Sequence, residues 1–273
     1  MQRLKQAIAD NDVLTASLLV SIKLDGGDRL ELSTYLERII EWSQQARVEG
    51  YVFPINEAAF TRLIKYFYVD LAFSDNPQNY FSCQYSLLNK VLDYRTGIPV
   101  SLAIVFQSIA VHLGFDVKGV NFPGHFLLRY QVTPERILYV DPSNGNFLSF
   151  ADLENLYFNI LSEIDDERMP IEALQAASCD EIIVRLLHNL KASYINEKKY
   201  QQALCAVELL VALCPEDPYE RRDRGFLLHQ LDCTQVAIAD YQYFIRQCPK
   251  DPANQLLEAQ VRQLNDSPPV VLH

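Results

Sequence analysis

The fold is decided by residues 95–150, which read RTGIPVSLAIVFQSIAVHLGFDVKGVNFPGHFLLRYQVTPERILYVDPSNGNFLSF. Pro99 suits the first position of a helix, and apolar residues then recur every three or four positions until Gly114. Three strand-like runs follow at 116–122, 125–132 and 136–141, with turn residues between them, and a last short run spans 147–150. The pattern predicts a buried helix packed on an antiparallel sheet.

Two polar residues of this stretch are placed to meet in the folded chain. His125 opens the second strand-like run and Asp141 closes the third, so a hairpin would bring the carboxylate beside the imidazole. We predict a His125–Asp141 hydrogen bond, which would serve a reaction or simply orient the strands. Asn121 and Asn144 are further candidates for polar groups in a cleft, with surface or turn roles as the alternative.

Three motifs of this stretch resemble a known family: Gly97-Ile98-Pro99, then Asn121-Phe122-Pro123-Gly124-His125, then Val140-Asp141-Pro142. They are similar to the SirB1-type branch of the transglutaminase-like superfamily, which is related to papain-like cysteine proteases, and the resemblance covers residues 79–150. It implies an α+β fold with a helix-plus-antiparallel-sheet core. In active members a Cys at the helix start is the nucleophile, a His is the base and an Asp orients the His. The resemblance assigns the second and third roles to His125 and Asp141.

The nucleophile of the superfamily has no counterpart, because Pro99 occupies the position of the thiol. Ser101 lies in the first helical turn, where backbone N–H groups and the helix dipole favour a developing negative charge, or it is a capping and packing residue. Two residues along a helix turn a side chain by about 200°, so we expect Ser101 to miss the cleft. Cys83 is a displaced nucleophile or a buried packing residue among aromatic neighbours.

We therefore interpret the chain as a noncatalytic or weakly active protein that acts as a protein-interaction or regulatory module. The alternative is a hydrolase or acyltransferase on peptide or amide bonds, in which His125 and Asp141 would work with Ser101 or Cys83. A structure that places a nucleophile within hydrogen-bond reach of the imidazole would favour the enzyme.

Composition limits the partners. The 273 residues carry a net charge of −11 and a pI near 4.9, which argues against nucleic acid and anionic membranes as partners. The surplus acid either favours a protein or peptide partner with a basic surface or simply keeps the protein soluble. The six cysteines contain no CxxC pair and the five histidines show no paired ligand spacing, so we expect reduced thiols, no metal and no cofactor. The N-terminal residues make a poor signal peptide and no run reaches transmembrane length, so we expect a cytoplasmic protein. The oligomeric state is not predicted.

An internal repeat marks the C-terminal part. Cys214-Pro215-Glu216-Asp217-Pro218 recurs as Cys248-Pro249-Lys250-Asp251-Pro252 at an offset of 34 residues, the tetratricopeptide period. Small residues at Ala203, Gly225 and Ala237 would let paired helices approach closely. Two repeats are few, so we expect them to depend on the core domain for stability. No run of Lys, Arg and Asn resembles a clamp for a peptide carboxylate, and Lys191, Lys198 and Lys199 are the only candidates for one.

The sequence thus predicts five parts. Residues 1–78 form an N-terminal helical subdomain, with helices to about residue 24, over 30–48 and over 55–73. A transglutaminase-like core follows over 79–162, and a charged linker over 163–179. Tetratricopeptide-type helices span 180–265, and the tail at 266–273 is disordered.

Overall fold

The chain divides into two compact units, Met1–Asn189 and Leu190–His273. A computed structural model describes residues 1–26, 31–76, 81–160 and 168–266. The expected linker falls partly, and the expected tail almost entirely, outside the described residues. The five-part division of the chain stays a prediction.

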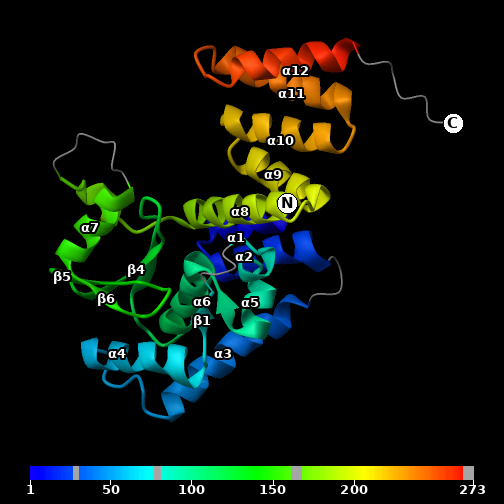
Figure 1. The fold of residues 1–273 in the computed structure, drawn as a ribbon. Helices are drawn as coiled ribbons and strands as arrows, with labels where there is room; N and C mark the ends of the chain where they lie inside the picture. Colours follow the sequence, from blue (N-terminus) through cyan, green and yellow to red (C-terminus); the bar gives the residue numbers. More distant parts are fainter. Residues whose placement is uncertain (27–30, 77–80, 161–167, 267–273) are drawn as a thin grey trace. The chain divides into compact units, whose positions relative to one another are not determined.

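The first unit is built around helix α6 (Pro99–His112), which carries Pro99 at its first position as its sequence predicts. Ten of its residues are buried. It contacts α2 (Val13–Ser21), α3 (Leu32–Val48) and α5 (Leu88–Tyr94) and also two strands of the sheet (Figure 1). Because neighbours cover it on several faces, α6 is apolar almost all round and not amphipathic.

The strands beside α6 form one antiparallel sheet in the order β3-β4-β5-β6. They are β3 (Val117–Val120), β4 (Leu127–Thr133), β5 (Arg136–Val140) and β6 (Phe147–Leu148). Leu128 pairs with Val140, so the start of β4 lies opposite the end of β5. The α+β fold and the expected sheet are confirmed.

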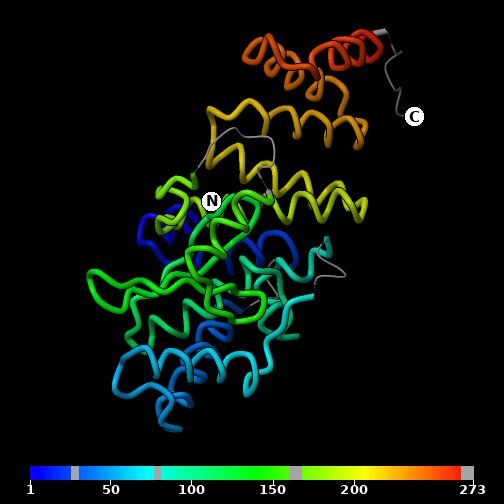
Figure 2. Tube along the Cα trace, turned by 60° about the vertical axis from the view of Figure 1, so that its left-hand side comes forward, coloured from blue at the N-terminus to red at the C-terminus, as the bar shows by residue number. Residues whose placement is uncertain are grey.

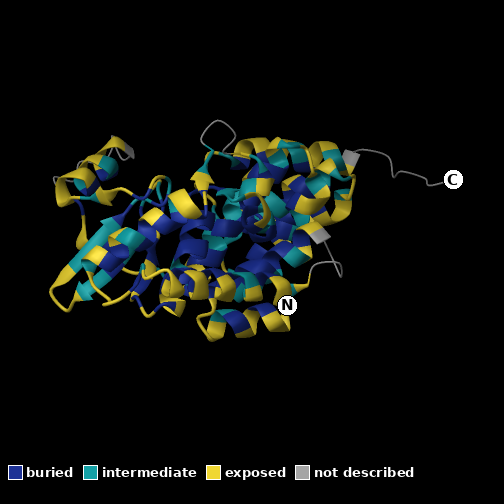
Figure 3. Ribbon diagram, turned by 90° about the horizontal axis from the view of Figure 1, so that it is seen from below, coloured by how far each residue is buried: buried dark blue, intermediate teal, exposed yellow. Residues whose placement is uncertain are grey.

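Helix α7 (Phe150–Ile160) and the short helix η6 (Ile171–Leu174) contribute to an apolar cluster of this unit. The cluster joins buried residues of the strands and turns to those of the two helices: Val120, Phe122, Leu127, Leu153, Tyr157, Met169 and Leu174. In Figure 3 the dark blue buried residues gather where elements pack together, while yellow exposed residues lie on outer faces.

The first of the predicted N-terminal helices differs from the expectation. The segment predicted to reach about residue 24 is broken into α1 (Gln2–Ala9) and α2, followed by a π-helical turn at Ile22–Gly26. Asn11 adopts a positive φ of 57°, and Asp12 caps α2 by accepting a hydrogen bond from Thr15 N at 3.0 Å. Asn and Asp offer the backbone such local bonds, which explains the break.

The third predicted helix, expected over 55–73, ends at Asp70. It consists of α4 (Glu57–Lys65) and a π-helical turn, η3 (Tyr66–Asp70). Beyond it lies a parallel strand pair that the sequence does not reveal, β1 (Ser74–Asp75) with β2 (Thr96–Gly97). Strands of two residues are too short to show alternation, so the sequence pattern predicts only a loop at Asp75. The short helix η5 (Cys83–Tyr85) lies between the two strands in sequence.

The second unit consists of consecutive helices that run from yellow to red in Figure 2. Helix α8 (Cys179–Asn196) begins in the first unit and ends in the second, and α9 (Tyr200–Leu213), α10 (Pro218–Gln230), α11 (Thr234–Gln247) and α12 (Asn254–Asp266) follow. A Cβ added to Gly225 on α10 would lie 2.9 Å from the Tyr241 ring on α11. The small residue therefore permits close approach of the paired helices, as the repeat pattern predicts.

Candidate functional site

A cleft of about 310 Å³ opens in the first unit beside the start of α6. Its lining combines Pro99 and Val100 of the helix start with residues of four other segments, most of them polar: Asp75, Gly124, His125, Phe126, Ser143, Arg185 and Asn189. The candidate site residues can therefore be judged by their positions around one cavity.

His125 and Asp141 meet at the edge of the cleft. His125 Nε2 lies 3.2 Å from Asp141 Oδ1, so the predicted hydrogen bond is present. Both residues lie just outside the strands, in the turn before β4 and the turn after β5. Since an ionised carboxylate can only accept, the pair places a proton on Nε2 and leaves Nδ1 as the nitrogen that could accept one.

Asp141 is held as an anion. Burial by itself would raise the pKa of its carboxyl group, but the hydrogen bonds from His125 and from the backbone N–H of Ser143 prevail and lower the pKa. Ser143 N donates to Asp141 Oδ1 at 2.8 Å. Asn144 Nδ2 is 3.5 Å from Asp141 Oδ2, so Asn144 belongs to the turn and does not line the cleft.

Tyr68 contacts the turn that carries Asp141. The Tyr68 hydroxyl donates to Pro142 O at 2.7 Å. Gly145, at φ +77°, lies so close to the ring that an added Cβ would be 2.6 Å from Tyr68 Cε2. Burial, and then the charges of Asp141 and Asp75, raise the pKa of Tyr68, which therefore stays a neutral donor. Sequence analysis did not identify Tyr68.

Asp75 is a carboxylate that lines the cleft. Strand β1 pairs Asp75 with Gly97, two residues before Pro99. Burial, and then the charge of Asp141, raise the pKa of Asp75, although Ser143 and Asn76 donate hydrogen bonds to it. Among the described residues its Oδ1 atom is buried without a hydrogen-bond partner. Only the long-range pairing of β1 with β2 brings this residue to the site.

Arg185 and Asn189 come to the cleft from helix α8. Their spacing of four places them on one face of the helix. Arg185 Nη1 donates to Asn121 Oδ1 at 3.3 Å, and in the part of the chain that is described Arg185 has no ion-pair partner. Asn121 thus takes part in the site by contacting Arg185, although it does not line the cleft itself.

The candidate nucleophiles lie elsewhere. Ser101 is fully buried, its Oγ donates to Tyr85 O at 2.7 Å and accepts from Ile98 N at 3.0 Å, and it does not line the cleft. Cys83 is buried in η5 and is not a lining residue either. The structure therefore brings together His125, Asp141 and Pro99 but not Ser101 or Cys83.

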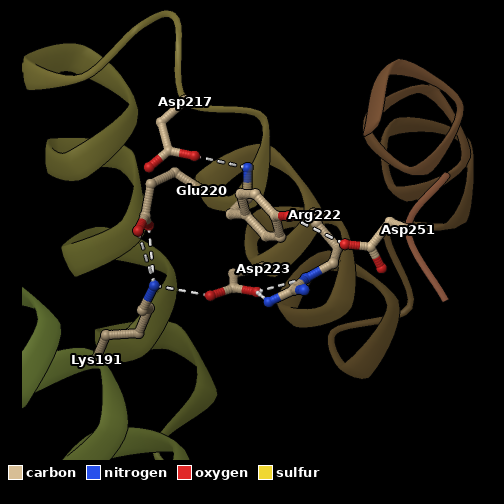
Figure 4. Close-up of polar contacts among 7 residues, drawn as sticks. Lys191, Asp217, Glu220, Arg222, Asp223 and Asp251 are labelled. Carbon is tan, nitrogen blue, oxygen red and sulfur yellow. Dashed lines mark hydrogen bonds and ion pairs between the residues drawn. The ribbon is translucent and has the colours of Figure 1, made fainter. Parts of the chain in front are cut away.

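Two of the three lysine candidates of the second unit, Lys191 and Lys199, form ion pairs inside that unit, and Lys198 is exposed. Lys191 Nζ lies 3.0 Å from both carboxylate oxygens of Glu220 and 2.7 Å from Asp223 Oδ2 (Figure 4). Lys199 pairs with Glu197 at 2.7 Å. The charge of Lys191 is therefore compensated by carboxylates inside the unit.

Neither a metal site nor a membrane-spanning helix is found in the part of the chain that the structure describes. Residues 1–26, 31–76, 81–160 and 168–266 contain no group of three or more His, Cys, Asp or Glu arranged to hold a metal ion. Over the same ranges, no helix combines the length and apolarity needed to cross a bilayer.

Two known families match the chain, and each match falls mainly within one of the two units. The family described as the transglutaminase-like superfamily matches residues 31–188, and the tetratricopeptide repeat matches residues 190–262. The boundary between the two matches coincides with the division at Asn189.

Several proteins are similar over most of this chain. A UPF0162 protein of Vibrio cholerae is 38% identical over 217 residues, which are 80% of each chain. A UPF0162 protein of Pasteurella multocida is 33% identical over 264 residues, or 97% of each. Protein SirB1 of Salmonella typhimurium is 33% identical over 238 residues, 87% of this chain and 86% of that protein. No solved structure matches the chain.

Proposed function

Since this chain belongs to the SirB1/UPF0162 branch of the transglutaminase-like superfamily, with tetratricopeptide repeats at its C-terminal end, we propose that it is a noncatalytic module that binds another protein. One observation carries the proposal. His125 in the cleft is hydrogen-bonded to Asp141, the pair to which the resemblance gives the roles of base and orienting carboxylate, but Pro99 stands where the resemblance places the nucleophile.

Proline at this position removes two chemical groups at once. It offers no thiol or hydroxyl, and it has no backbone N–H that could stabilise a developing oxyanion at the helix start. Pro99 and Val100 instead give the cleft an apolar floor. An apolar floor with a few polar groups around it is the usual lining of a binding pocket.

The alternative function is a hydrolase or acyltransferase on peptide or amide bonds, and the intact His125–Asp141 hydrogen bond favours it. Such an enzyme needs a nucleophile within about 2.6–3.2 Å of the imidazole. Ser101 uses its hydroxyl both to donate to Tyr85 O and to accept from Ile98 N inside the protein. Activation of Ser101 would require both bonds to break and the helix start to rearrange.

The second unit supports a role in binding, because tetratricopeptide repeats generally mediate protein–protein contacts. The net charge of −11 favours a partner with a basic surface. We therefore expect the partner of the full chain to carry an excess of Lys and Arg on the face that it presents.

Turnover assays test this proposal. The purified full chain is incubated with fluorogenic amides and acyl donors beside three variants, His125→Ala, Ser101→Ala and Cys83→Ala. We expect no turnover above the His125→Ala background. Turnover that disappears in His125→Ala and in one of the two nucleophile variants would establish the hydrolase instead.

A Pro99→Cys variant tests whether a thiol at this position would lie beside His125. The substitution restores the thiol at the helix start beside His125. An alkylating probe that labels the introduced thiol rapidly only when His125 is present would show that the two side chains meet.

A further inference from the structure

The cleft presents two kinds of charged group that the fold does not pair with each other. Asp75 has Asp141 and His125 as its electrostatic neighbours. Arg185, on the α8 side, is hydrogen-bonded to the neutral side chain of Asn121. A ligand that carries both a positive and a negative group could therefore satisfy both sides.

On the acidic side, the carboxylate of Asp75 is not paired with a cation among the described residues. Asp141 accepts hydrogen bonds from His125 and Ser143 N, but Asp75 has no cationic partner among the described ion pairs. Among the described residues, Asp75 Oδ1 is buried without a hydrogen-bond partner, and burial, followed by the charge of Asp141, raises the pKa of Asp75. An ammonium or guanidinium group would offset both effects.

The basic side is suited to a carboxylate. A guanidinium forms paired hydrogen bonds with a carboxylate, and the single bond to Asn121 leaves most of the N–H donors of Arg185 unused within the described chain. Asn189 lies one helical turn away on the same face and can donate a further bond. The first turn of α6, which begins at Pro99, directs its dipole toward the same cavity.

The geometry points to the C-terminal end of a polypeptide as the ligand: we propose that its carboxylate binds Arg185 and Asn189 while a basic side chain of its last or next-to-last residue binds Asp75. This inference rests on the proposed function and names the ligand class of the same cleft. A cavity of about 310 Å³ lies at the small end of ligand pockets, so it accommodates a chain end and not a long segment. Capture of a terminal carboxylate is an established mode of peptide recognition.

The test is a panel of four fluorescent hexapeptides of otherwise identical sequence. They end in Lys or Gln, and each is made with a free or an amidated C-terminus. Anisotropy titrations use the full-length wild type, Arg185→Gln, Asp75→Asn and the double variant. Arg262→Gln and Asp116→Asn serve as controls, because these side chains are 75% and 55% exposed and lie outside the cleft.

We expect the free-acid Lys peptide to bind most tightly, and each lost charge pair to weaken binding about tenfold. Arg185→Gln should abolish the preference for the free acid but keep the preference for Lys. Asp75→Asn should do the reverse, and the two controls should bind like the wild type. The two preferences are read separately, so a folding defect in one variant does not remove the other test.

Three outcomes would overturn the inference: no difference between acid and amide, preferences that survive in the variants, or no binding by any peptide. Mass spectrometry of the same samples reads the proposed function independently. Unaltered peptides that bind without regard to their ends would contradict only this inference. Peptides that are cleaved or acyl-transferred in a His125-dependent way would contradict the proposed function itself.

Discussion

The partly buried charges of the helical repeats and those of the cleft in the first unit differ in whether other residues of the chain pair with them. In the helical repeats, Lys191 is enclosed by Glu220 and Asp223, and Arg224 pairs with Asp240 through two bonds of 2.6 and 2.7 Å. In the cleft, Asp75 has a buried oxygen without a hydrogen bond and Arg185 has no ion-pair partner within the described ranges. Lys191 and Arg224 of the repeats are thus compensated inside the chain, whereas Asp75 and Arg185 of the cleft are not paired by the described residues.

This difference separates charges that stabilise the fold from charges that are available to a ligand. Removing one member of a buried pair leaves the other uncompensated, and that is expensive. Removing a charge that the fold does not pair should cost little, or even stabilise the protein. Single substitutions in the full chain can test this contrast.

The largest effect is expected for Lys191→Ala. It removes the cation shared by Asp223 and by Glu220, whose side chain is 4% exposed, so we expect a loss of about 3–5 kcal/mol from the free energy of unfolding. Urea unfolding followed by circular dichroism measures it, with the exposed Lys250→Ala as the control. A loss no greater than that of the control would show that the network is solvated.

Gly145→Ala should have the next largest effect, because φ is +77° and the new Cβ would collide with the Tyr68 ring. We expect a loss of about 2–3 kcal/mol. Gly50→Ala is the matched control, since Gly50 has the same φ but no atom within 4 Å, and it should cost about 1 kcal/mol. Fluorescence of the single Trp42 reports unfolding of this unit, and equal losses in the two variants would mean that Tyr68 does not support the Asp141 turn.

Asp141→Asn should cost about 1 kcal/mol at pH 7, because it weakens the bonds to His125 and Ser143. The folded-state pKa of Asp141 is lowered, so its contribution to stability is present above the ordinary Asp value of 3.8 and is lost as the pH falls through the folded value. Urea titrations between pH 7 and pH 3 should show the wild-type advantage shrinking toward acid. An advantage that is independent of pH would exclude ionisation as its source.

Asp75→Asn should have the smallest effect and the opposite sign. Burial and Asp141 raise the pKa of Asp75, so its contribution is complete below 3.8 and is lost as the pH rises through the folded value. The variant, which cannot ionise, should be more stable than the wild type at pH 7 by less than about 1 kcal/mol, since partial exposure screens the charge. At pH 3 the two should be equal, and a variant that is less stable at pH 7 would show that Asp75 is paired after all.

Much of the fold could be predicted because its patterns are local. Pro99 and the apolar spacing after it predicted α6. The recurrence of Cys-Pro at 214 and 248 predicted the repeats, whose paired helices approach closely where Gly225 lies against the Tyr241 ring. The His125–Asp141 hydrogen bond was also expected, since a hairpin joins residues that are near in sequence. By contrast, the break at Asn11 depends on capping bonds that compete with a continuous helix.

The sequence by itself determined the fold class, the repeat architecture and the absence of a thiol at position 99, because these follow from periodicity and from residue identity. Only the tertiary structure decided which other side chains surround the cleft. Asp75 arrives there through a strand pair of two residues, Tyr68 through a π-helical turn, and Arg185 through a helix more than eighty residues along the chain from Pro99. Contacts between segments so distant in sequence leave no local pattern, since they depend on how apolar faces pack against one another.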